Sequence, residues 1–181
     1  MSMHRRALLT LGLGSLLPPV AQALDRPAEL QSVWPQAQLI GSGRMRFLGL
    51  SIYDAHLWAP APLSAADWSE RPLAIELVYT RSLQGAQIAE RSLDEMRRQL
   101  NIGSADAERW LATMKATFPD VRDGDRLTGI YRLGDSARFY WNGGLRRTWS
   151  DAALAKHFFG IWLSPQTSEP SLREALFGGR V

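Results

Sequence analysis

The chain has 181 residues, a formal net charge of +3 and no cysteine. The lack of cysteine excludes disulfides, thiolate nucleophiles and cysteine-ligated metal centres. Arg5 and Arg6 supply two of the three net charges, and the other basic residues form no run that could track phosphates, so we expect no nucleic-acid partner.

The N-terminal residues have the three parts of a secretory signal peptide. Arg5 and Arg6 form a positively charged start, and residues 7–20 are uncharged and mostly apolar. Ala21 and Ala23 then supply small residues at the two positions that a signal peptidase recognises. The paired arginines also fit a twin-arginine signal, and this alternative to the general export route stays open.

We therefore expect residues 1–23 to be a cleaved signal peptide and residues 24–181 to form a single periplasmic or secreted domain. A transmembrane anchor is the alternative, but the apolar stretch is shorter than the roughly 20 residues that a bilayer requires. Two prolines, Pro18 and Pro19, also interrupt it. After cleavage we expect no stable membrane span.

Hydrophobic periodicity and turn residues predict the following elements. Up to the middle of the chain they are a lead-in (24–34), a strand or bent hairpin with a possible bulge at Gly49 (39–58), a loop (59–72), a strand (73–79), a helix (about 89–100) and a helix capped by Ser104 (to 118). After a turn they are two strands (126–133 and 137–141) joined at Gly134-Asp135, a turn (142–144), a helix capped by Ser150 or Asp151 that runs through His157, and a last helix opened by Pro170.

This order predicts an α+β protein. Strands come first, a pair of amphipathic helices follows, and further strands precede the C-terminal helices. A βαβ alternation, which would indicate a parallel sheet, is not present in the pattern. The apolar faces of the helices are expected to pack on the sheet and form the core.

Two arginines are the best candidates for binding a ligand. Arg44 and Arg46 are two residues apart on a predicted strand, among apolar neighbours. A guanidinium that faces an apolar cleft suits a carboxylate or an enolate, because it is permanently charged and bidentate. Tyr53 could add a hydroxyl. The equally plain alternative is a pair of arginines that face the solvent.

Other polar groups give weaker indications. His56 and Asp54 share one side of the predicted strand and could form a general base with its orienting carboxylate. His157 lies beside two phenylalanines and is expected to pack in a helix interface. The aspartates of residues 120–125 lack the spacing of a calcium-binding loop. We expect neither a metal ion nor a cofactor.

Four segments resemble the bacterial chalcone isomerase-like family. They lie in the same order as in the family, and the resemblance covers about residues 39–178. The segments are Gly41–Trp58, Ile88–Met96, Phe118–Asp125 and Phe158–Ser168.

The resemblance implies an open-faced β-sandwich, in which helices pack over one face of a large antiparallel sheet and leave a ligand cleft between. Plant chalcone isomerases use a tyrosine and an asparagine near the first helix, and these positions fall on Ile88 and Glu95. Isoleucine donates no hydrogen bond, and glutamate would repel a developing enolate. Only the arginine persists, as Arg44 or Arg46. The fold also includes non-catalytic fatty-acid-binding members.

Together these features predict an exported, non-catalytic protein that binds a small amphipathic anionic molecule such as a fatty acid. Arg44 or Arg46 would hold the head group with help from Tyr53. One alternative is an intramolecular lyase or isomerase with other chemistry, which would place His56 or Glu95 opposite the arginine. A second is an interaction module with no small ligand. Fold alone does not decide among them.

Overall fold

The structure is a computed structural model that describes residues 24–132 and 136–179. The predicted signal peptide and the predicted Gly134-Asp135 hairpin turn lie outside these residues. The elements in chain order are α1 (Ala28–Val33), β1 (Gln38–Phe47), β2 (Leu50–Ala59), a short 3₁₀ helix (Trp68–Glu70), β3 (Leu73–Tyr79), α2 (Gly85–Met96), α3 (Ser104–Thr117), β4 (Arg126–Arg132), β5 (Ser136–Trp141), β6 (Gly144–Trp149), α4 (Ala152–Leu163) and α5 (Pro170–Leu176).

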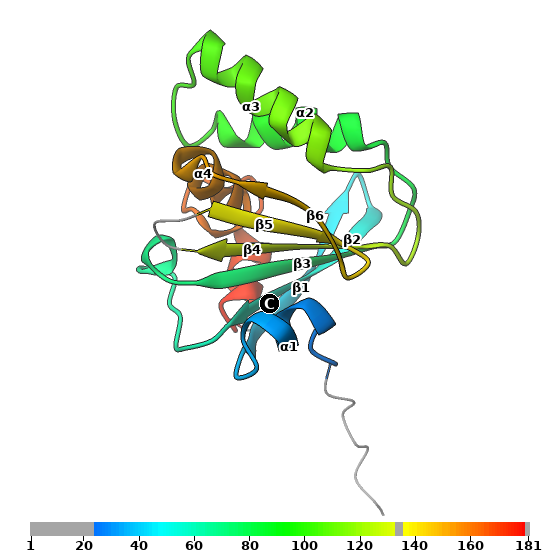
Figure 1. The fold of residues 1–181 in the computed structure, drawn as a ribbon, viewed down its shortest axis with the longest axis vertical. Coiled ribbons are helices and arrows are strands. Elements are labelled where there is room, and N and C mark those ends of the chain that lie inside the picture. Colours follow the sequence, from blue (N-terminus) through cyan, green and yellow to red (C-terminus); the bar gives the residue numbers. More distant parts are fainter. Residues whose placement is uncertain (1–23, 133–135, 180–181) are drawn as a thin grey trace, which may run out of the picture.

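The six strands form one antiparallel sheet in which every strand pairs with its neighbour in the chain. α2 packs on α3 and α4, α4 packs on β4 and β5, and α5 packs on β1. Figure 1 shows α2 and α3 at the top of the view and α1 at the bottom, with the strands between them. The fold is therefore α+β, with a large antiparallel sheet and helices over one face, as predicted.

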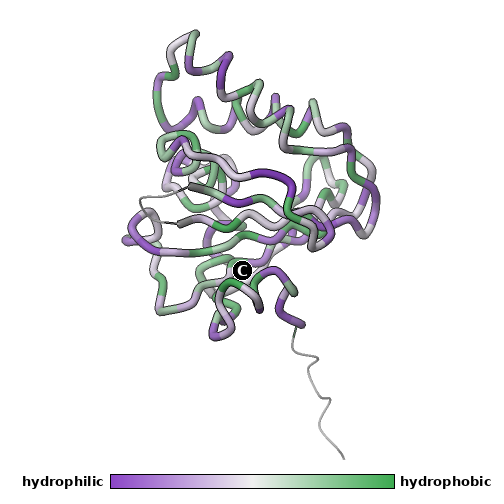
Figure 2. The backbone as a smooth tube through the Cα atoms, in the orientation of Figure 1, coloured by the Kyte–Doolittle hydropathy of each residue, from purple (hydrophilic) through white to green (hydrophobic). Residues whose placement is uncertain are grey.

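The side chains of β3 show how the sheet divides the molecule. Leu73, Ile75, Leu77 and Tyr79 point to the helical layer and belong to the main core. This is the alternation that the sequence predicts for residues 73–79. In the helical layer, hydrophilic and hydrophobic residues alternate along α2 and α3, as expected of helices with one buried face (Figure 2).

The opposite face of the sheet is partly covered by α1, which the sequence left as an irregular lead-in. Leu30 of α1 is fully buried in a small second core with Trp58, Ala74 and Ile130. A six-residue helix is too short to give a strong periodic signal. Its stability comes from this packing and not from helix propensity.

Several local predictions were wrong. Gly49 lies in the β1–β2 turn, and the bulges fall between Leu39 and Gly41 and between Met45 and Arg46. Ser104 is the first residue of α3, whose N-cap is Gly103. The helix expected to run through His157 continues to Leu163, while Asp151 caps it by accepting a hydrogen bond from the Leu154 N–H, as expected.

Candidate functional site

A cavity of about 300 Å³ lies between the sheet and the helices. This volume is at the lower end of the range of small-molecule sites in proteins. Most of its lining is apolar, from β2, β3, β4, β5 and α4: Ile52, Ile75, Leu77, Tyr79, Leu127, Gly129, Phe139, Phe158, Phe159, Ile161 and Trp162.

The inner wall is a cluster of aromatic rings. The centroids of Phe139 and Phe158 are 5.4 Å apart in an edge-on contact, and Phe118 stacks on Phe158 at 5.5 Å. Phe159 is fully buried. Gly129 of β4 faces two of these rings, and a Cβ there would approach Phe159 to 3.0 Å. The interior can therefore hold an apolar group but offers it few polar partners.

Polar groups gather at one end of the cavity, and we call Tyr53, Arg91, Glu95 and Glu169 the polar rim. Arg91 forms an ion pair with Glu95 at 2.5 Å, four residues on along α2. The Arg91 side chain is 58% exposed, whereas that of Glu95 is only 9% exposed. Because Arg91 and the equally exposed Phe47 both line the cavity, the cavity opens to solvent at this end.

The hydroxyl of Tyr53 is held in place. It accepts a hydrogen bond from the indole N–H of Trp162 at 3.0 Å, and the ring meets Tyr79 edge-on. Burial raises the pKa of Tyr53 to about 12, so the phenol keeps its proton at neutral pH. Since the indole takes one lone pair, the O–H remains able to donate toward the cavity.

The surroundings of the rim disfavour the charged form of its second carboxyl group, Glu169. Burial raises the pKa of the Glu169 carboxyl, the neighbouring Glu95 raises it further, and Arg91 opposes both effects. One carboxylate oxygen of Glu95, Oε2, is buried without a hydrogen-bond partner, and the Arg98 Nε lies 3.7 Å from it. A buried carboxylate oxygen without a hydrogen-bond donor is energetically unfavourable.

The structure separates the three predicted site residues. Tyr53 lines the cavity, but Arg44 and Arg46 do not. Arg44 forms a bidentate ion pair with Asp54 across the β1–β2 hairpin, with N–O distances of 2.6 and 2.8 Å. Arg46 is exposed. Met45 and Phe47, the alternate residues of the same strand, line the cavity instead. The ligand-binding role predicted for Arg44 and Arg46 therefore has no support in the geometry.

The arginine at the cavity is Arg91, which the sequence pattern did not single out as a site residue. Glu169, the N-cap residue of α5, was also missed. The i, i+4 spacing of Arg91 and Glu95 was a usable signal, because an ion pair beside an apolar stripe marks the border of a buried face. Ile88 and Glu95, the positions that the resemblance assigned to catalytic groups, do line the cavity.

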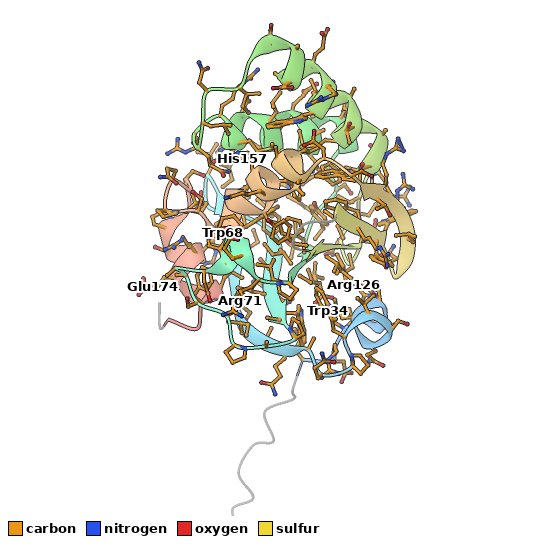
Figure 3. The ribbon with its side chains drawn as sticks, turned by 60° about the vertical axis from the view of Figure 1, so that its left-hand side comes forward. Trp34, Trp68, Arg71, Arg126, His157 and Glu174 are labelled. Carbon is orange, nitrogen blue, oxygen red and sulfur yellow. The ribbon has the colours of Figure 1, made fainter. Side chains whose placement is uncertain are left out.

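A second polar cluster lies on the opposite face of the sheet, beneath α1. The fully buried carboxylate of Glu29 accepts hydrogen bonds from the Thr128 hydroxyl at 2.5 Å and from Arg126 at 3.3 Å. Arg126 also approaches Glu76 to 3.3 Å, and the Trp58 indole donates to Glu76. Figure 3 shows Arg126 beside α1. This network joins the N-terminal helix to the middle of the sheet.

Asp54 and His56, considered above as a general-base pair, do not act together. Asp54 is paired with Arg44, and His56 lies next to Glu76 in the adjacent strand. Burial lowers the pKa of His56, which favours the neutral ring. His157 stacks near Trp110, with its backbone carbonyl accepting a hydrogen bond from Gln99, in agreement with a packing role.

The Glu76 carboxyl should make stability depend on pH. Its pKa is raised from 4.5 to about 7, chiefly by burial and also by Glu29, against the opposing effects of Arg126 and Trp58. The folded state holds the Glu76 proton more tightly than the unfolded state does. This group therefore contributes stability below pH 4.5, and the contribution is lost as pH rises through 7. We expect the free energy of unfolding to fall by about 2 kcal/mol more in the wild type than in Glu76→Gln over this pH range. Urea unfolding of both proteins from pH 4.5 to 8 measures it; parallel curves would contradict the assignment.

Neither a membrane span nor a metal cluster stands out in the described part of the chain. Among residues 24–132 and 136–179, no helix is long and apolar enough to cross a bilayer. Within those ranges, no three histidine, aspartate or glutamate side chains are grouped to hold a metal ion.

Comparison with known proteins decides the family. The sequence profile described as chalcone isomerase-like matches residues 22–178, nearly the whole chain. The chain belongs to the chalcone isomerase-like family. This confirms the resemblance seen in the four sequence segments.

Two individual proteins illustrate the relationship. An uncharacterised protein of Haemophilus influenzae is 33% identical over 110 residues, which is 61% of this chain and 54% of that protein, so the match spans about half of the relative's length. The crystal structure of a fatty-acid binding protein of Arabidopsis thaliana superimposes with a TM-score of 0.62, covering 78% of this chain and 87% of that one. At 14% identity this second match establishes a shared fold.

Proposed function

We propose that this chalcone isomerase-like protein is exported and binds one small amphipathic molecule, with its apolar tail in the cavity and an anionic head at the polar rim. The observation that carries the proposal is an apolar, aromatic-walled cavity whose open end holds Arg91 and the Tyr53 hydroxyl. A fatty acid fits this division into tail and head. The fatty-acid binding protein with the same fold adds support by analogy.

The head group would bind by exchanging partners at Arg91. In the structure, Glu95 pairs with the Arg91 guanidinium at 2.5 Å. An incoming carboxylate takes over the guanidinium and accepts a second hydrogen bond from Tyr53. Glu95 then turns toward Arg98, whose Nε is already 3.7 Å away. Arg91 and Glu95 are thus never left without a counter-ion.

Binding fits the cavity better than isomerase chemistry of the plant type. Ile88 presents an apolar side chain where that chemistry requires a donor. Glu95 places a carboxylate where an enolate would form, and like charges there would raise the barrier.

Mass spectrometry of the protein purified from an exporting host tests export and binding together. We expect an intact mass that corresponds to cleavage between Ala23 and Leu24, and a co-purifying small molecule with one anionic head and an apolar tail. An intact mass that retains Arg5 and Arg6 would contradict export. A protein released without any small molecule, and unable to bind added dodecanoate, would contradict the binding function.

A further inference from the structure

The turn between β1 and β2 carries an unusual concentration of exposed apolar side chains. Phe47, Leu48 and Leu50, which we call the apolar hairpin tip, are 52%, 86% and 54% exposed. Half of the six large hydrophobic residues exposed in the described ranges are in this four-residue stretch. Single exposed leucines are ordinary, but a cluster on one protruding turn indicates a contact surface.

The fold does not require leucine at this turn. Leu48 and Gly49 have φ of 49° and 80°, the positive pair that a two-residue hairpin turn demands. The β5–β6 hairpin makes the same turn with Asn142 and Gly143, at φ of 48° and 85°. Asparagine is the favoured residue at such a position, whereas leucine is disfavoured there. The chain therefore keeps a strained, solvent-exposed leucine where its own second hairpin uses asparagine.

The apolar hairpin tip lies at the open end of the cavity. Phe47 lines the cavity, and the Arg91 guanidinium lies 5.9 Å from the centre of the Phe47 ring. Arg46, next to Phe47 and exposed, adds a second cation beside the tip. A cluster of exposed apolar side chains flanked by arginines is the arrangement that enters the boundary of a lipid bilayer.

We propose that the apolar hairpin tip inserts into the surface of an anionic lipid bilayer and brings the cavity opening against the lipid. Two features favour a bilayer over a protein partner. The tip is a two-residue hairpin turn with three exposed apolar side chains, whereas a stable protein interface requires about 800 Å² on each partner. The flanking arginines match anionic lipid head groups, whose negative surface potential attracts basic residues. This docking does not depend on what the cavity binds.

Sedimentation with vesicles tests the proposal. We expect the protein to bind phosphatidylcholine vesicles that contain phosphatidylglycerol more tightly than vesicles of phosphatidylcholine alone. Leu48→Asn should weaken binding about tenfold, because it removes the most exposed apolar side chain of the tip. Its melting temperature should be unchanged or higher, since asparagine suits the turn. Leu145→Asn, at a residue 60% exposed on β6, is the matched control and should bind as the wild type does.

A fluorescent probe locates the contact independently of the N-terminal segment, which all variants share. Because the chain has no cysteine, Leu48→Cys and Leu145→Cys each provide a single labelling site. An environment-sensitive dye should shift to the blue with anionic vesicles at position 48 and not at position 145. Equal vesicle binding by the wild type and Leu48→Asn, or equal dye shifts at both positions, would overturn the proposal. Failure of the wild type to bind vesicles would do the same and favour a protein partner.

Discussion

Replacing Glu95 by glutamine is expected to strengthen the binding of dodecanoate about tenfold, whereas replacing Arg91 by glutamine should weaken it by about ten- to a hundredfold. Both effects follow from competition for one guanidinium. Glu95 pairs with Arg91 at 2.5 Å, and an incoming carboxylate must displace it. A charge-assisted hydrogen bond is worth about 1.5–3 kcal/mol, which sets the size of the loss. Isothermal titration calorimetry with each protein measures both.

The opposite signs of the two effects identify the charge of the head group. Dodecylamine should respond in reverse, with weaker binding to Glu95→Gln, and dodecanol should respond little to either variant. Arg97→Gln is a matched control and should bind dodecanoate as the wild type does, because Arg97 pairs with Asp94 and does not line the cavity. If Glu95→Gln weakens dodecanoate binding and Arg91→Gln leaves it unchanged, the rim does not recognise an anion. Loss of dodecanol binding in all variants would instead indicate a damaged fold.

The position of the arginines shows what strand periodicity decides and what it leaves open. Arg44 and Arg46 share one face of β1, as their two-residue spacing predicts, but that face is the outer one. Periodicity assigns residues to the same face without saying which face is buried. The alternate residues were informative, because Met45 and Phe47 are apolar and both line the cavity. Comparing the two sets of alternate residues would have placed the arginines outside.

Edge position explains why β6 was not predicted. The Asn142-Gly143 turn before it was recognised, but the strand itself carries Arg146 and Arg147 and is exposed along most of its length. An edge strand with polar residues on both sides has little apolar alternation, and charge there prevents pairing with other molecules. The strand exists because β5 offers it hydrogen bonds, which is a long-range effect absent from the local pattern.

The helical side of the cavity was predicted in outline only. The apolar stripe of α2 was recognised, but its periodicity alone did not mark Glu95 as buried, and Glu95 is 8% exposed. A carboxylate at the border of the stripe becomes buried when α4 packs beside the helix. No local sequence pattern encodes how the helices pack against one another. Glu169 was missed for the same reason, because its place in the rim depends on where α5 packs.

Gly41→Ala is expected to destabilise the protein by about 3 kcal/mol, because it would push α5 away from the sheet. A Cβ on Gly41 would lie 2.5 Å from the Leu176 carbonyl oxygen and 2.8 Å from the Gly178 nitrogen, and closer still to the Ala175 carbonyl. All three are backbone atoms, so no side-chain rotation relieves the contact. In a domain of this size the melting temperature should fall by about 10 °C.

Gly103→Ala is the matched control for this test. Nothing lies within 4 Å of a Cβ at that position, and its φ of −61° suits any residue, so thermal melting should change little. Wild-type melting of Gly41→Ala would show that α5 does not pack on β1. The substitution should also affect the cavity, since Glu169 occupies the N-cap position of α5 and lines the cavity. Displacing α5 removes Glu169 from beside Glu95 and Arg91, so the folded fraction of Gly41→Ala should bind dodecanoate with altered affinity even where its sheet is intact.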